Sequence, residues 1–177
     1  MSMSPNPFHS DTPGLAIDPA TVTGIAHTDG LVTTWSMASQ LPHAGYLPAE
    51  LMRRLGNLHQ RHPFEWIAVE HASMGTTRKR TAEFHGLLRG AIEIWAFQNG
   101  RIPVKRYMPT SIKKHLTGNG RATKQQMMAA CRTLLGIAPK NDNEADAAAL
   151  LSLALADRKA KQMQSQARRS QPRQRNL

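Results

Sequence analysis

Two short apolar segments, each ending in a carboxylate, constrain the fold of this chain more than any other feature. Residues 14–17 run into Asp18, and residues 66–69 run into Glu70. A short apolar run bounded by turn residues is typical of a buried strand. A buried charge is costly unless it is paired or binds a metal, and α/β sheets usually place their chemistry at the ends of such strands. The alternative for Asp18 is a turn or capping role before Pro19.

The spacing of apolar and turn residues predicts a mixed central sheet flanked by helices. Asp29-Gly30 favours a two-residue hairpin. We therefore expect a three-stranded antiparallel meander near residues 14–18, 24–28 and 31–37. Two further strands are expected near residues 64–70 and 102–107. Helices are expected near residues 48–60, 81–98, 112–116, 125–135 and 142–156. This order predicts one α/β domain.

Composition sets the class of partner and the boundaries of the domain. The chain has 177 residues and a net charge of +11, which favours a polyanion, nucleic acid before an anionic membrane. We expect a flexible N-terminus over residues 1–12, a folded domain over residues 13–157 and a disordered basic tail over residues 158–177. No signal peptide and no membrane span are expected. The single cysteine, Cys131, excludes an internal disulfide, fits a reducing cytosol and is interpreted as a packing residue.

A third carboxylate, Asp146, lies near the start of the last expected helix. Asp142 and Asn143 lie four and three residues before it, so that each shares a helix face with Asp146. Carboxylates brought together repel one another unless a cation neutralises them, and oxygen ligands suit Mg²⁺ or Mn²⁺. On a basic chain this pattern indicates a metal-dependent phosphodiesterase acting on nucleic acid. From this helix alone, the favoured interpretation is that Asp142 is the N-cap and that Asp146 merely lies in the second turn.

Two basic clusters are candidates for DNA contacts, and two glycines bear on packing. The first cluster comprises Arg78, Lys79 and Arg80. The second surrounds a glycine-rich stretch, for which phosphate binding is favoured over a flexible connector, and comprises Lys113, Lys114, Arg121 and Lys124.

Gly86 and Gly90 lie in the helix expected at residues 81–98, and we expect that helix to pack closely on the sheet. The histidines show no spacing typical of a metal site, so zinc is not expected.

Taken together, residues 14–155 resemble the RuvC-type Holliday-junction resolvases of the ribonuclease H-like (retroviral integrase) superfamily. The resemblance rests on five motifs in order: Asp18 with its small-residue turn, the strand ending in Glu70, Arg89-Gly90, residues 113–124 with Thr-Gly-Asn-Gly, and residues 143–149. It implies a ribonuclease H-like fold in which Asp18, Glu70 and Asp146 are catalytic metal ligands. It also implies DNA contacts by Lys113 or Lys114, and by Lys124.

One position departs from the family pattern, because Asn143 stands where the penultimate acid is expected. Either Asn143 ligates through its amide oxygen, or Asp142 supplies the charge one residue earlier, or the second metal is bound weakly. We favour assistance by Asp142.

The resemblance implies a homodimer that places two active sites on a four-way DNA junction. Each site would nick one strand by metal-activated water, with two Mg²⁺ ions, or Mn²⁺ in their place, during recombination and repair. The expected location is the cytoplasm, at the nucleoid or in a phage-infected bacterial cell. The alternatives are a broader structure-selective nuclease acting on forks, flaps or R-loops, and a non-catalytic protein that binds branched DNA.

Overall fold

The computed structural model describes residues 6–37, 46–71 and 79–170. The strands are β1 (Gly14–Asp18), β2 (Val22–His27), β3 (Val32–Ser36), β4 (Trp66–Glu70) and β5 (Val104–Tyr107). The helices are α1 (Tyr46–Arg61), α2 (Lys79–Gln98), α3 (Pro109–Thr117), α4 (Lys124–Leu134) and α5 (Asp142–Ser170). The strands form one sheet in the order β3-β2-β1-β4-β5. In the described part of the chain, no helix has the length and apolar character needed to cross a bilayer.

The pairing of the strands confirms the predicted mixed sheet. β1, β2 and β3 form the antiparallel meander, and the turn between β2 and β3 contains Gly30 at a φ of 102°. Glycine accepts this left-handed conformation without a steric cost. β4 pairs with β1 in parallel and β5 pairs with β4 in parallel. Parallel neighbours end at the same edge of a sheet, so β1, β4 and β5 share their C-terminal edge.

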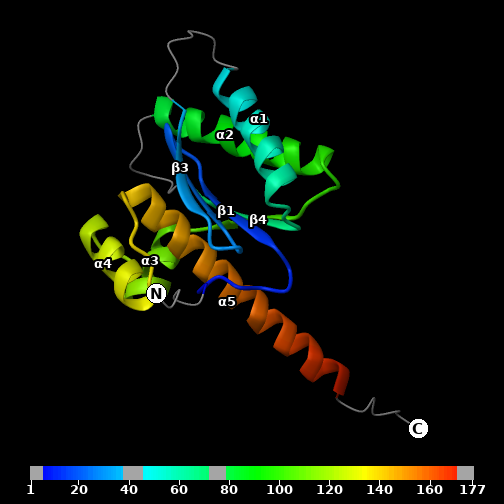
Figure 1. Cartoon of the computed structure of the whole chain (residues 1–177), viewed down its shortest axis with the longest axis vertical. Coiled ribbons are helices and arrows are strands. Elements are labelled where there is room, and N and C mark those ends of the chain that lie inside the picture. The colour runs from blue at the N-terminus through cyan, green and yellow to red at the C-terminus, as the bar shows by residue number, and fades with distance from the viewer. Residues whose placement is uncertain (1–5, 38–45, 72–78, 171–177) are drawn as a thin grey trace.

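Helices cover both faces of the sheet, and the two faces carry different side chains (Figure 1). Successive residues of a strand point to opposite faces. Leu15 and Ile17 therefore pack with α1 and α2, whereas Ala16 packs in the cluster that includes α3, α4 and α5. On the α5 face, alanines of the strands meet alanines of the helix, among them Ala147 and Ala148. Small side chains on both partners let α5 lie close to the sheet, as expected from its sequence.

The predicted role of two glycines in α2 is wrong. Gly86 and Gly90 were expected at a close contact with the sheet, yet a Cβ atom at either position would meet nothing within 4 Å. Leu88, Ile92 and Trp95 make the contact with the core instead. The two glycines lie on the other side of the helix, because they are two residues out of phase with that apolar stripe.

The chain is also ordered beyond the boundaries expected for the domain. Phe8 is buried in the core, and the amide of Asn6 donates a hydrogen bond to the carbonyl oxygen of Thr28 at 2.8 Å. Part of the segment expected to be flexible is thus held on the β2–β3 turn, because one aromatic side chain anchors it. Residues 1–5 and 171–177 of the expected flexible ends lie outside the described residues.

α5 continues past residue 156, so that residues 158–170 are helical rather than part of a disordered tail. The Asp157 carboxylate anchors this extension: it accepts a hydrogen bond from the Tyr107 hydroxyl at 3.1 Å and pairs with Lys105 at 2.5 Å. The scarcity of apolar residues suggested disorder, but alanine, lysine, glutamine and arginine are good helix formers. Extending an existing helix also needs no new nucleus.

Candidate active site

Two of the three candidate catalytic carboxylates come from adjacent parallel strands. Ile17 of β1 pairs with Val69 of β4, so the next residues, Asp18 and Glu70, end the two strands side by side. Both residues are partly buried. The apolar runs that predicted the strands therefore also fix the two acids at one edge of the sheet, where their charges interact.

The third carboxylate reaches this edge because the start of α5 crosses the sheet closely. Gly24 of β2 pairs with Asp18, and a Cβ atom at Gly24 would lie 2.2 Å from the backbone oxygen of Asn143. Any larger residue at this position would push the helix away from the strand. The absence of a side chain at Gly24 thus lets α5 bring Asp146 to the ends of β1 and β4.

Burial and like charge raise the pKa values of all three carboxyl groups. Burial, with the charges of Asp146 and Asp142, raises the pKa of Asp18 to about 7. Burial, with the charges of Asp18 and Asp146, raises the pKa of Glu70 to about 8. The pKa of Asp146 also rises, chiefly through burial. The protein alone does not neutralise these groups, and a buried set of oxygen donors of this kind fits a hard divalent cation.

At the start of α5, Asn141 rather than Asp142 caps the helix. The side-chain oxygen of Asn141 accepts a hydrogen bond from the backbone N–H of Glu144 at 2.9 Å. The Asp142 carboxylate instead forms an ion pair with Lys124, and this hydrogen bond lowers the pKa of Asp142. Asp142 still lies close enough to raise the pKa values of Asp18 and Asp146. The capping interpretation is therefore wrong, and Asp142 forms one flank of the carboxylate site.

Of the two neighbouring lysines on α3, Lys113 faces the carboxylates. Its charge opposes the rise in the pKa values of Glu70 and Asp146. Lys114, one residue further around the helix, is exposed, and no contact places it at the carboxylates. Because successive residues of a helix point about 100° apart, only one of the pair can take this position.

The glycine-rich stretch between α3 and α4 is a tight, hydrogen-bonded turn. Gly118 ends α3 at a φ of 75°, and Thr123 begins α4 with a capping box that involves Gln126. Between them, the side-chain oxygen of Asn119 accepts a hydrogen bond from the backbone N–H of Arg121 at 2.9 Å. The turn leaves Arg121 and Lys124 exposed, and Lys124 lies beside the carboxylates through its ion pair with Asp142, which suits contacts with phosphates.

Two candidates remain: Cys131, which the sequence predicts to be a packing residue, and the basic cluster of residues 78–80. Cys131 is buried in the core, and burial raises the pKa of its thiol to about 11, which fits the expected packing role. Arg78 lies outside the described residues. Lys79 and Arg80 begin α2, but their side chains also lie outside the described part of the structure.

A second group of ionisable side chains has no counterpart in the sequence patterns. His27, Asp29 and His62 place their ligand atoms within 4.8 Å of one another. His62 is far from the other two in sequence, so spacing alone could not reveal the group. The only local signal was His27-Thr-Asp29, a histidine and a carboxylate around a tight turn.

Comparison with protein families gives one match that spans much of the chain. The family described as "Crossover junction endodeoxyribonuclease RuvC" matches residues 38–157. The match includes Glu70 and Asp146 but begins after β3, so Asp18 lies outside it. The position of Asp18 in the site therefore rests on the sheet register and on the charges around it.

Curated relatives carry the same name. The RuvC of Chloroflexus aggregans is 33% identical over 146 residues, which cover 77% of this chain and 88% of the relative. That of Anaeromyxobacter sp. (strain Fw109-5) is 40% identical over 110 residues, which cover 62% of this chain and 49% of the relative. With Anaeromyxobacter relatives such as this one, the match spans about half of their length.

Solved structures support the fold. The structure "T. thermophilus RuvC in complex with Holliday junction substrate" superposes with a TM-score of 0.71 at 26% identity, covering 84% of this chain and 96% of that one. The yeast mitochondrial Holliday junction resolvase Ydc2 gives a TM-score of 0.57 at 12% identity, covering 88% and 85% of the two chains. The second likeness concerns the fold alone.

Proposed function

Because the chain belongs to the RuvC family of crossover junction endodeoxyribonucleases, we propose that it cuts four-way DNA junctions by paired strand nicks. The observation that carries this proposal is the gathering of Asp18, Glu70 and Asp146 at one sheet edge with raised pKa values. The likeness to a RuvC bound to a Holliday junction supports the choice of substrate. DNA of this kind would be met in the cytoplasm, at the nucleoid or on phage DNA.

The donor set favours a hard divalent cation, in keeping with a metal-dependent family. All proposed ligand atoms are oxygens, from Asp18, Glu70 and Asp146 with help from Asp142 or the amide of Asn143, and such ligands suit Mg²⁺ and Mn²⁺. We propose two ions per site. When bound, the ions supply an activated water and stabilise the charge that develops on the leaving oxygen.

The side chains of the protein bind and orient the DNA around this centre. Lys113 and Lys124 both interact with the charges of the carboxylates, where a phosphate would otherwise be repelled. Lys124 shares its charge with Asp142 and could exchange that partner for a phosphate oxygen. We propose that Lys114 and Arg121, which are exposed, contact the backbone further from the cut. The same role for Arg78, Lys79 and Arg80 stays a prediction.

We propose that two copies assemble through the outer side of α2, since symmetric nicking requires two sites. This side exposes Leu87, Ile94 and Phe97 to 53%, 54% and 66%. Next to them, a groove of about 540 Å³ between α1 and α2 is lined almost wholly by apolar residues and by glycines at which nothing lies within 4 Å. Helices with glycine on the facing side can approach closely, and a second α2 is the occupant that this surface fits.

Cleavage of matched DNA substrates tests the proposed reaction. A labelled four-way junction, a fork and a linear duplex of the same sequence would be incubated with the protein in Mg²⁺. Paired symmetric nicks in the junction alone support the proposal. Equal cutting of forks identifies a broader structure-selective nuclease. Tight junction binding without cutting in Mg²⁺ or Mn²⁺ identifies a non-catalytic binding protein and makes Asn143 the residue to explain.

Sedimentation tests the proposed dimer separately. Ile94→Glu places a charge on the exposed face of α2, where burial against a partner would be costly. We expect the wild type to sediment as a dimer and this variant as a folded monomer. Lys114→Glu is the matched control, because it places a glutamate on α3, away from α2. A wild type that is monomeric at micromolar concentration contradicts the proposal.

A further inference from the structure

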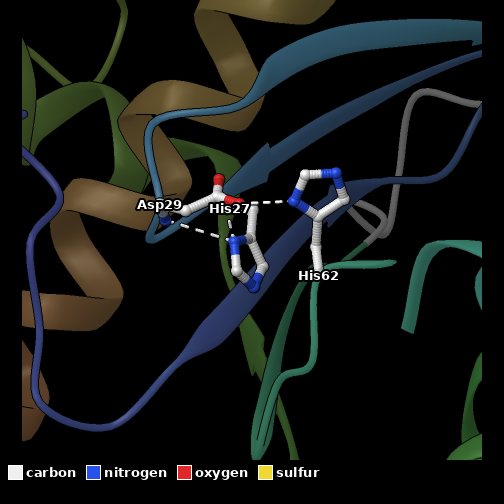
Figure 2. A group of neighbouring side chains, drawn as sticks. All are labelled: His27, Asp29 and His62. Atoms are coloured by element: carbon white, nitrogen blue, oxygen red, sulfur yellow. Dashed lines mark hydrogen bonds and ion pairs between the residues drawn. The ribbon is translucent and has the colours of Figure 1, made fainter. Parts of the chain in front are cut away.

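The inference concerns the group formed by His27, Asp29 and His62, at the other end of β2 from the carboxylates (Figure 2). His27 ends β2, Asp29 lies in the β2–β3 turn and His62 directly follows α1. On β2, His27 lies three residues beyond Gly24, which pairs with Asp18. Three residues of a strand span roughly 10 Å. The group is therefore separate from the proposed catalytic centre.

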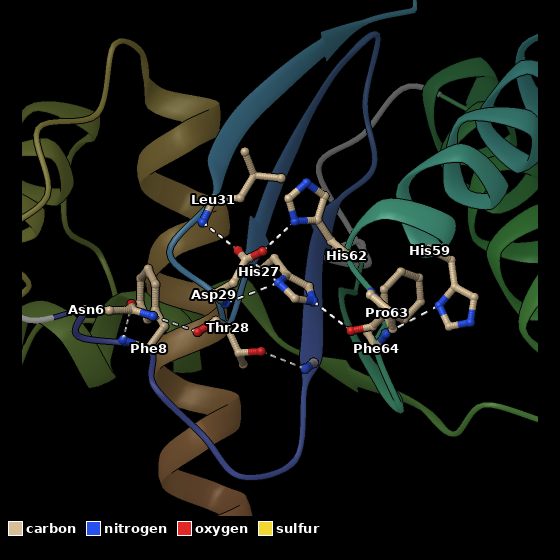
Figure 3. Close-up of polar contacts among 11 residues, drawn as sticks. Asn6, Phe8, His27, Thr28, Asp29, Leu31, His59, His62, Pro63 and Phe64 are labelled. Atoms are coloured by element: carbon tan, nitrogen blue, oxygen red, sulfur yellow. Dashed lines mark hydrogen bonds and ion pairs between the residues drawn. The ribbon is translucent and has the colours of Figure 1, made fainter.

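His27 is held with one ring nitrogen directed at Asp29. The ring is buried, and Nε2 lies 3.1 Å from the carbonyl oxygen of Pro63 (Figure 3). A carbonyl oxygen only accepts hydrogen bonds, so Nε2 carries a proton and Nδ1 offers a lone pair. Metal-binding histidines typically donate their other N–H to a carbonyl or carboxylate in this way, which fixes the tautomer and the ring orientation.

The Asp29 carboxylate lies between the two imidazoles. Its Oδ1 is 3.0 Å from Nδ1 of His27 and accepts a hydrogen bond from the backbone N–H of Leu31 at 2.9 Å. Its Oδ2 is 2.5 Å from Nδ1 of His62. In this structure the backbone N–H of Asp29 also donates to Nδ1 of His27, at 3.1 Å. The lone pair of Nδ1 is thus near a carboxylate oxygen, an arrangement that a cation would stabilise.

We propose that Nδ1 of His27, the Asp29 carboxylate and Nδ1 of His62 form a binding site for Zn²⁺ or a related first-row divalent ion. Two imidazole nitrogens and one carboxylate oxygen are ligands that zinc prefers, with water in a fourth position, whereas the oxygen-only carboxylate site suits Mg²⁺. Bonds of about 2.0–2.1 Å put tetrahedral ligand atoms roughly 3.4 Å apart. The three ligand atoms now lie within 4.8 Å of one another, so binding an ion would require shifts of at most roughly 1.5 Å.

The side chains around this site can move enough to admit an ion, and their positions in the fold decide which segments the ion would link. The side chains of His62 and Asp29 are 34% and 41% exposed, so they can move and a water can enter. The ion would displace the bond from the backbone N–H of Asp29 to His27. It would join the β2–β3 turn to the segment between α1 and β4, two parts of the chain that are distant in sequence. The bound ion would therefore raise the free energy of unfolding, because it links these two segments in the folded state.

The rival interpretation is a metal-free group held by hydrogen bonds alone. The full chain without a histidine tag, stripped with a chelator, would be titrated with Zn²⁺ by calorimetry and thermal unfolding. Excess Mg²⁺ would be present to occupy the carboxylate site. Asp29→Asn keeps an acceptor for Leu31 and an Asn-Gly turn but removes the charge, and His62→Ala removes a ligand. His115→Ala and Asp18→Asn are the matched controls.

We expect one Zn²⁺ per wild-type chain and a rise in the unfolding midpoint of several degrees. Asp29→Asn and His62→Ala should each weaken Zn²⁺ binding by at least about 100-fold and lose the rise, because the first removes the charge of one ligand and the second removes another ligand. Both controls should keep the rise. The proposal is overturned if the wild type binds no Zn²⁺, if both ligand variants bind it as tightly as the wild type, or if Asp18→Asn abolishes binding.

Discussion

The two ionisable groups at opposite ends of β2 differ in how the protein treats their charge. Asp18, Glu70 and Asp146 are acids of the same sign, buried together, and their pKa values rise. Asp29 lies between His27 and His62, and its pKa falls: burial alone would raise it, but the hydrogen bonds from the backbone N–H of Leu31 and from His62 lower it. In the first group the acids repel one another until a cation binds, whereas in the second the contacts of Asp29 already hold its pKa below the usual value.

This difference shows why a carboxylate cluster and a histidine–carboxylate cluster must be tested differently. A repulsive cluster weakens the fold until something binds, so removing one of its members stabilises the metal-free protein. A satisfied cluster stabilises the fold before anything binds, so removing a member destabilises it. The sign of the change in the free energy of unfolding therefore separates the two groups without any assay of activity.

The largest expected effect is the loss of cleavage in Asp146→Asn. The substitution keeps the shape of the side chain but removes the charge of a proposed metal ligand, and metal ions contribute several kcal/mol to such reactions. Since each 1.36 kcal/mol is tenfold in rate, we expect junction cleavage in Mg²⁺ to fall at least about 10³-fold. Gel-shift binding of the junction is the control and should persist. Cleavage at the wild-type rate would exclude Asp146 from the site.

The next effect is a pH dependence of stability that a metal ion removes. In the folded state the pKa values of Asp18 and Glu70 rise from 3.8 and 4.5 to about 7 and about 8. Between the ordinary and the raised values, the folded protein keeps protons that the unfolded chain has released. The free energy of unfolding therefore falls as pH rises through this window, by roughly 2–5 kcal/mol for the coupled pair.

Urea unfolding at about pH 5 and about pH 8.5, with a chelator and with Mg²⁺, measures this dependence. Mg²⁺ should restore the lost stability at the higher pH. Asp18→Asn should flatten the pH profile without a metal, because one of the two titrating acids is gone. If the metal-free wild type were more stable at the higher pH, the repulsive description of the carboxylates would be wrong.

A smaller effect distinguishes the two lysines of α3. Lys113→Ala removes the positive charge that opposes the pKa rise of Glu70 and Asp146, whereas Lys114→Ala removes an exposed charge with no such effect. We expect cleavage to fall about 10- to 100-fold in Lys113→Ala, since a charge aimed at the reacting phosphate is worth a few kcal/mol. Lys114→Ala should lose less than about threefold. Single-turnover rates at saturating protein separate the two, and equal losses would contradict the assignment.

What the sequence could predict depended on whether the signal was local. The runs before Asp18 and Glu70 combine strand-forming residues with one terminal acid, and the parallel register follows once both strands are buried. Asp146 was predictable because the alanines after it allow close packing. Gly24 was noticed only as part of a strand. Its role depends on the approach of Asn143 from a distant helix, which no local pattern contains.

The mispredicted parts have causes of the same kind. The presence of Gly86 and Gly90 predicts a packing surface, but the phase of the apolar stripe decides which side of a helix is buried. The sequence did not predict the helix past residue 156, because a scarcity of apolar residues indicates that a segment is not buried but does not show that it is not helical. The histidine group was missed because His62 joins it only through the path of the chain after α1.

The smallest expected effect tests the opposite sign of the histidine group. His62→Ala breaks the ion pair with Asp29, whose partners are 34% and 41% exposed. Partly exposed pairs contribute about 0–1 kcal/mol, so we expect a loss of that size in the free energy of unfolding near pH 6 without a metal. Asp18→Asn, measured beside it at about pH 8, should gain stability. If His62→Ala also gained stability, the histidine group would hold unrelieved repulsion as the carboxylates do, and its description as a satisfied cluster would fail.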